Sequence, residues 1–261
     1  MSSVNVVGTW PLRPEWLRAL EESVHRFFPG NVTIQLCNDS SAEYVMLVEK
    51  GPPVRLNFNL AARWAASELF QGGYLDAAVK HESRHIHGDI IFLHAGIIAP
   101  LALKETVPEP LWRRASEILT EKLQLLLNET YALAVTEDTD ASKYLDYELW
   151  KFTRTWNQED RRSTVKAHWI LHAALLASAC GSLNKAIPDG LASVLAFFKR
   201  DMHDEAILSQ AVKLFNGLWN AVRAAMPIGE DEKHQFNILA DTIQLSELVS
   251  IQKKPLFDDA S

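Results

Sequence analysis

Strand-like segments are confined to one short part of the chain, which ends at Leu60. There are three such runs, at residues 32–37, 44–48 and 54–60. All three are rich in Val, Ile, Leu, Tyr and Phe, and turn-forming residues separate them, Asn38-Asp39-Ser40-Ser41 and Gly51-Pro52-Pro53. Because both links are too short for a crossover helix, we expect a small sheet that is antiparallel at least in part.

The rest of the sequence predicts helices. Apolar residues recur at helical spacing over residues 13–28, and Pro29-Gly30 ends that helix. Further helices are expected at residues 61–70, 75–98, 111–135, 143–155, 159–180, 191–200, 203–225 and 232–251, with a polar loop at 136–142. We therefore predict an α+β fold, with a small N-terminal β-sheet and its helices followed by a predominantly helical C-terminal half.

Composition excludes some classes of partner. The formal net charge of −7 argues against a general nucleic-acid or anionic-membrane binder, since both need a basic surface. The chain shows no secretory signal and no apolar stretch long enough to span a membrane, so we expect a cytoplasmic protein. Its two cysteines, Cys37 and Cys180, are expected to be buried free thiols rather than a disulfide. The sequence does not indicate an oligomeric state.

One short motif carries chemistry, His81-Glu82-Ser83-Arg84-His85. On a helix, its two histidines lie one turn apart and about 40° around the axis, so both can bind one Zn²⁺ at roughly 2.0–2.1 Å. Glu82 lies about 100° from His81 and about 60° from His85, where it can accept a proton from activated water. Asp89, one turn after His85, is a candidate hydrogen-bond partner for a ligand imidazole. The alternative is an amphipathic surface helix that merely carries polar residues.

A catalytic zinc site needs a third protein ligand, and the best candidate is Glu129. It stands in an apolar helical segment, between Leu125-Leu126-Leu127 and Ala132-Leu133-Ala134. A carboxylate in such surroundings is costly unless it is paired or binds a metal. The alternative is a surface Glu on the polar stripe of that helix.

Together, His81-Glu82-x-x-His85 and Asn128-Glu129-x-x-Ala132 resemble the zincin metallopeptidases, specifically the gluzincin branch, in which a Glu on the next helix completes the site. The resemblance implies that His81, His85 and Glu129 bind zinc. It also implies that Glu82 is the general base.

The same resemblance implies a zincin-like core over residues 1–136, with residues 137–261 as a helical subdomain on the other side of the cleft. The chain departs from the thermolysin-like pattern at Leu133, where an Asp often follows the ligand Glu. It departs from the longer metzincin signature at Ile91, where the final His of that signature would fall.

Further candidates come from a second histidine pair, His168 and His172, again one helical turn apart. These side chains could join the metal sphere, or stabilise the oxyanion of a tetrahedral intermediate, or simply pack between helices. We name His168 and Tyr131 as candidate catalytic residues. Further possible oxyanion donors are Tyr144, Tyr147 and Arg154.

The sequence therefore predicts a zinc-dependent hydrolase, most simply a metallopeptidase or amidohydrolase that cleaves a peptide-like amide bond with Glu82 as general base. The strand run at 54–60 could hold an extended substrate by strand addition. A second hypothesis is a non-haem Fe(II) enzyme, which also uses two His and one carboxylate. A third is a non-catalytic helical interaction protein with a structural metal, in which His168 or His172 would be a fourth ligand.

Overall fold

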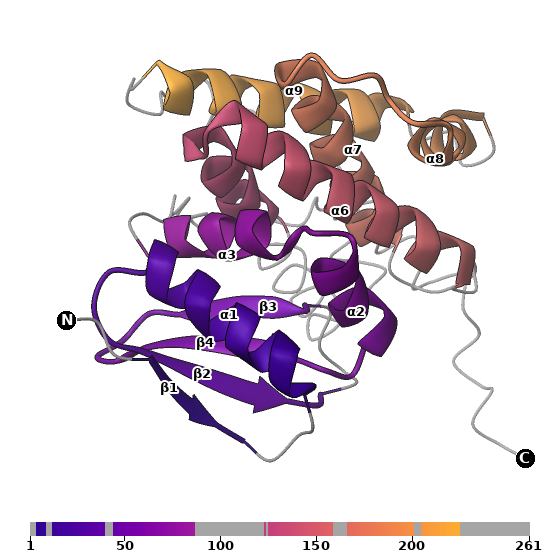
Figure 1. Ribbon diagram of the computed structural model, residues 1–261. Helices are drawn as coiled ribbons and strands as arrows, with labels where there is room; N and C mark the ends of the chain where they lie inside the picture. The colour runs from indigo at the N-terminus through magenta and orange to yellow at the C-terminus, as the bar shows by residue number, and fades with distance from the viewer. Residues whose placement is uncertain are drawn as a thin grey trace, which may run out of the picture. The chain divides into compact units, whose positions relative to one another are not determined.

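The computed structural model describes residues 4–8, 12–39, 44–86, 123, 125–158, 166–200 and 205–224. It is an α+β structure, mostly helical, with one small sheet near the N-terminus (Figure 1). The chain divides into two compact units. The first comprises Met1–Asp89 and Ala132–Lys151, and the second Ile90–Tyr131 and Phe152–Ser261. The predicted fold class is confirmed at this level.

The sheet has four strands in the order β1-β2-β4-β3. They are β1 (Val4–Val7), β2 (Val32–Cys37), β3 (Met46–Glu49) and β4 (Val54–Asn59). β1 runs parallel to β2 because helix α1 (Pro14–Phe27) connects them, and β2 runs parallel to β4. β3 and β4 are joined by a short turn and pair antiparallel, as expected.

One predicted role is wrong for this sheet. The run at 54–60 was expected to accept a substrate strand, but β4 pairs with β2 on one edge and with β3 on the other. The main-chain groups of an interior strand are already used in the two ladders, so β4 has no edge to offer. Within the described residues, the edge strands are β1 and β3.

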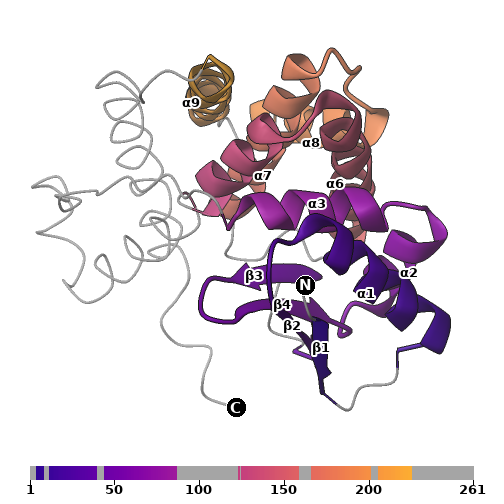
Figure 2. The same cartoon turned by 60° about the vertical axis from the view of Figure 1, so that its left-hand side comes forward.

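The core of the first unit lies between the sheet and its helices. Leu20 and Val24 of α1 are fully buried, as are Ile34, Leu56 and Phe58 of the sheet. Helices α2 (Arg63–Gln71) and α3 (Leu75–Arg84) follow β4, and α1 runs alongside α3 in both views of the ribbon (Figures 1 and 2).

Polar contacts fix the start of α3 to α1. The hydroxyl of Ser23 donates to Asp76 Oδ1 at 2.7 Å, and Arg26 forms an ion pair with the other oxygen of the same carboxylate. Asp76 stands in the first turn of α3, where a negative charge is favourable to the helix dipole. The contacts therefore set the position of the helix that carries the histidine motif.

A helix was predicted over residues 75–98, and the described part of this range contains α3. It ends at Arg84, and His85 and Ile86 form a turn. The amides of these two residues donate three positions back, to Glu82 and Ser83, which is the tighter bonding common at helix ends. His85 keeps helical dihedrals, with φ −61° and ψ −20°. The predicted continuation over residues 87–98 lies outside the described residues.

Residues 125–135 form a further helix, called the Glu129 helix below. A loop was predicted at residues 136–142. This prediction is wrong for residues 138–142, because α6 (Asp138–Gln158) already begins at Asp138. The carbonyl of Glu137 accepts from the amide of Ala141 at 2.8 Å. Asp138 and Asp140 lie in the first turn, where carboxylates stabilise a helix. An acidic helix start was therefore interpreted as a polar loop.

The second unit contains the helices α7 (Lys166–Ser182), α8 (Asp189–Arg200) and α9 (Glu205–Arg223), which pack on one another. A hydrogen bond of 2.6 Å joins Ser178 on α7 to Asn216 on α9. The C-terminal part of α6 contributes Trp156, which lies edge-on to Trp169. None of the helices in the described part of the chain combines the length and the apolar character that a bilayer span requires.

Both cysteines are free, as predicted. Cys180 is buried in α7, and Cys37 is half-buried in β2. Burial raises the pKa of the Cys37 thiol, and its sulfur lies 3.6 Å from the carbonyl oxygen of Phe58. This thiol therefore stays protonated at neutral pH and acts as a structural group of the sheet.

Candidate metal centre

Helix α3 presents the histidine motif in an enclosed environment. Leu75, Ala77 and Ala78 are buried, and small side chains let neighbouring elements approach the helix closely. His81 is completely buried, Glu82 is 5% exposed, and His85 at the helix end is partly exposed. One imidazole is thus held inside the protein, while the other lies nearer the solvent.

The two imidazoles meet through the nitrogens that would bind a metal. His81 Nε2 and His85 Nε2 are 3.3 Å apart, and the rings lie edge-on with an interplanar angle of 79°. Two nitrogens that each bind a tetrahedral Zn²⁺ at about 2.0–2.1 Å are about 3.3–3.4 Å apart. Two nitrogens at this distance can either share a proton or bind one metal ion. The third group at the site helps to decide between these two alternatives.

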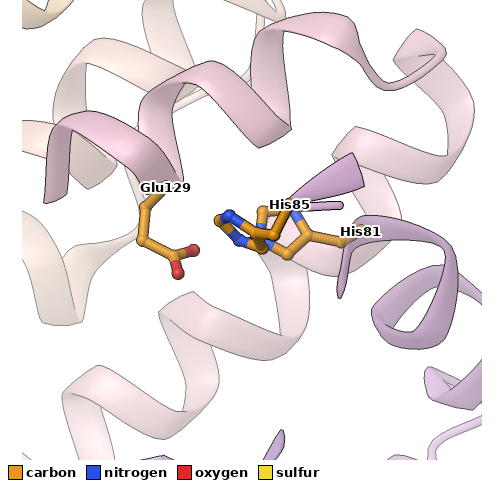
Figure 3. A group of neighbouring side chains, drawn as sticks. All are labelled: His81, His85 and Glu129. Carbon is orange, nitrogen blue, oxygen red and sulfur yellow. The ribbon is translucent and has the colours of Figure 1, made fainter. Parts of the chain in front are cut away.

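That third group is the carboxylate of Glu129, which points toward the two rings (Figure 3). One ligand atom from each of His81, His85 and Glu129 lies within 4.8 Å of the other two. Glu129 is partly buried on a helix whose neighbouring positions, Leu126 and Leu127, are buried and apolar. A negative charge in such a position favours a cation beside it.

The three side chains fit a zinc ion with a small adjustment. Zinc ligands in a tetrahedral site are about 3.4 Å apart, so a separation of 4.8 Å would shorten by about 1.4 Å on binding. Rotation about the side-chain bonds of Glu129 can supply a shift of that size. Two imidazoles and one carboxylate are also a donor set that catalytic zinc sites use, with a further position left for water.

Glu82 does not belong to this group of potential ligands in the described part of the chain. It follows His81 directly on α3 and is nearly as buried. Its place next to His81 on the helix keeps Glu82 a candidate proton acceptor, as the spacing of the motif predicts.

Packing from α6 supports the same end of α3. The ring of Tyr144 lies flat on the imidazole of His81, with ring centroids 4.0 Å apart and an interplanar angle of 18°. Lys80 forms ion pairs with Asp140 at 2.5 Å and with Glu137 at 3.3 Å. Lys80 and Asp140 were not predicted from the sequence, and Tyr144 was predicted only as a possible oxyanion donor. The aromatic residues at helical spacing in α6 were the one sequence feature that could have indicated this packing.

The other candidates have different surroundings. The hydroxyl of Tyr147 donates to the carbonyl of Ala65 at 3.2 Å, and burial raises the pKa of Tyr147 well above its usual range. Tyr131 follows Glu129 by two positions, so the two side chains leave their helix about 160° apart. Arg154 is exposed on α6.

In the second unit, His172 of α7 is partly buried and lies edge-on to Phe152 at 5.0 Å. The side chain of His168 lies outside the described residues, and so do Asp89 and Ile91. The candidate roles of Tyr131 and His168 stay predictions.

Comparison of the chain with protein-family models, with curated proteins and with solved structures finds no significant match. The resemblance to the zincin metallopeptidases therefore rests on the two short motifs.

Proposed function

We propose that this protein is a zinc-dependent hydrolase, a metallopeptidase or amidohydrolase that cleaves a peptide-like amide bond. The observation that carries the proposal is the convergence of His81 Nε2 and His85 Nε2 at 3.3 Å, with a carboxylate oxygen of Glu129 in the same 4.8 Å group. In this proposal the three side chains bind the metal. When bound, Zn²⁺ polarises a carbonyl group and lowers the pKa of water to about 7.

Glu82 is the proposed general base. As the water oxygen bonds to the scissile carbonyl carbon, the Glu82 carboxylate accepts a proton from the water. The C–N bond then breaks, and Glu82 returns this proton to the leaving nitrogen. Its near-complete burial supports the role, because a carboxyl group removed from bulk water exchanges protons more readily with a bound reactant than with solvent. His168 and Tyr131 remain the predicted oxyanion donors, although Tyr131 leaves its helix about 160° from the proposed ligand Glu129.

The order of elements in the first unit agrees with a zincin-like core, in which a helix and a sheet precede the motif helix. Of the strands described, β3 is an edge strand and contacts α3. An extended peptide that adds to the edge of β3 would therefore run beside the motif helix, with its main chain held by strand hydrogen bonds. This favours a peptide as the substrate.

The test combines metal analysis with turnover. Protein purified without added metal is analysed for zinc and iron, and hydrolysis of a mixed library of internally quenched peptides is measured. We expect one zinc per chain, and turnover that falls by about 100-fold or more in Glu82→Gln while zinc content is unchanged. Glu148→Gln is the matched control, since Glu148 is also buried on a helix of the first unit but pairs with Lys151.

Two results would contradict the proposal. One is a zinc-loaded protein that hydrolyses no peptide in the library. The other is turnover in Glu82→Gln equal to that of Glu148→Gln. Stoichiometric iron in place of zinc would favour the Fe(II) hypothesis instead.

A further inference from the structure

The imidazole of His81 has a flat aromatic neighbour. The phenol ring of Tyr144 stacks on it at 4.0 Å and 18°, and both side chains are buried, His81 fully and Tyr144 with 7% exposed. We propose that Tyr144 is a positioning residue for the metal centre, which holds the plane of the His81 ring in the orientation that a metal requires. This inference rests on the proposed metal site.

The physical reason is the rotational freedom of a histidine ring. The torsion between Cβ and the ring is broad, so an imidazole without a close neighbour samples many planes. A parallel ring at van der Waals distance restricts that torsion. Since Nε2 of His81 already lies 3.3 Å from Nε2 of His85, the restricted plane is one in which both nitrogens can share a metal. Less freedom is then lost on binding, and affinity rises.

Tyr144 is itself held from both sides along α6. One turn before it, Asp140 forms an ion pair with Lys80, the residue that precedes His81. Three residues after it, Tyr147 donates a hydrogen bond to Ala65 and packs on Tyr74. These contacts fix α6 to α2 and α3 within the first unit, so the stacked ring cannot follow a movement of the imidazole.

Tyr147 provides the matched control. It is 2% exposed, lies on the same helix and packs in the same aromatic cluster, where its ring contacts are with Tyr74, Tyr144 and Trp150. Replacing it removes a buried phenol of equal size without removing the ring that stacks on His81. A loss of metal affinity that comes only from a weakened core would appear in both replacements.

The experiment measures Zn²⁺ affinity by competition with a chromophoric chelator, and the visible absorption of the Co²⁺-substituted protein. We expect Tyr144→Leu to bind Zn²⁺ about tenfold more weakly than the wild type and to show weaker and shifted Co²⁺ bands. Tyr144→Phe keeps the ring and should stay within about threefold of wild-type affinity. Tyr147→Leu should unfold at lower denaturant concentration. Because it keeps the ring that stacks on His81, it should lose much less Zn²⁺ affinity than Tyr144→Leu. Tyr144→Met preserves more volume and replaces Tyr144→Leu if that variant does not fold.

The outcomes separate the two proposals. Equal Zn²⁺ affinity in Tyr144→Leu and Tyr147→Leu would overturn the positioning role, as would a loss in Tyr144→Phe as large as in Tyr144→Leu. A wild-type protein that binds neither Zn²⁺ nor Co²⁺ would instead overturn the proposed metal site.

Discussion

Two helices of this chain carry a pair of histidines one turn apart, and the described surroundings of the two pairs differ. At the C-terminal end of α3, His81 and the C-cap residue His85 bring their Nε2 atoms to 3.3 Å, and the carboxylate of Glu129 belongs to the same group. On α7, the pair is His168 and His172, and His172 lies edge-on to the ring of Phe152. Apart from Lys166, the residues of α7 carry no charge, and its middle turns are buried and apolar.

The difference shows what sequence spacing alone can establish. A separation of four residues places two imidazoles on one face of a helix in both cases. Whether they can hold a metal depends on the groups that surround that face. The α3 pair has buried Glu82 next to it in the sequence and a carboxylate within the ligand group, while the described ring contact of His172 is with Phe152. A metal centre thus requires charge as well as geometry.

The largest expected effect separates the two pairs directly. His81→Ala removes one of three proposed ligands and should weaken Zn²⁺ binding on the order of 1000-fold, or about 4 kcal/mol. His172→Ala should leave the affinity unchanged. Chelator competition on both purified variants gives the comparison. Zinc binding that survives His81→Ala but is lost in His172→Ala would reverse the assignment of the two pairs.

The next effect concerns the carboxylate that distinguishes α3. Glu129→Gln keeps the size of the side chain but removes its charge, and should weaken Zn²⁺ binding by about 100-fold, or about 2.7 kcal/mol. Glu137→Gln is the control, since the Glu137 carboxylate is largely exposed and pairs with Lys80. Equal affinities in the two variants would remove Glu129 from the metal site.

The sequence predicted the elements that local patterns determine. β2 was predicted at its observed bounds because its apolar residues form a continuous run between turns. β1 was not predicted. It has four residues, and its strand character depends on parallel pairing with β2 across the length of α1, a contact that no local period reveals. The start of α6 was missed because Asp138 and Asp140 have the polarity of a loop, although both suit a helix N-terminus.

The candidate site shows the same limit. The positions of His81, Glu82 and His85 follow from helix geometry, which a short motif determines by itself. The approach of Glu129 is tertiary, and it was suggested only by the apolar neighbours of this acid and by the resemblance of its motif to the gluzincin pattern. The stack of Tyr144 on His81 joins two helices far apart in sequence, so the sequence could supply no more than the aromatic spacing in α6.

A smaller effect is expected from the ion pairs at the base of the site. The side chain of Lys80 is 15% exposed, and its pairing with Asp140, then Glu137, raises its pKa above the ordinary value. Lys80→Met should lower the free energy of unfolding by about 1 kcal/mol. Because the folded pKa is raised, the stabilisation is complete below the unfolded pKa of about 10.4 and is lost as pH rises through the folded value.

Denaturant unfolding of the wild type and Lys80→Met at pH 8 and at pH 11 checks this prediction. The two proteins should differ at pH 8, and the difference should be smaller at pH 11. A difference that persists unchanged at pH 11 would mean that Lys80 contributes through packing of its aliphatic stem and not through its charge.

The smallest effect is expected on α7. His172→Phe replaces one flat ring with another of similar volume beside Phe152, so the free energy of unfolding should change by less than about 1.5 kcal/mol. Zinc affinity should not change, because His172 is not one of the three proposed ligands. A variant with normal stability but weakened zinc binding would place His172 in the metal site, as a structural centre with four protein ligands requires. Histidines from α3 and α7 would then bind the same ion. In that case the two pairs would not differ in function, because both would supply ligands to one metal site.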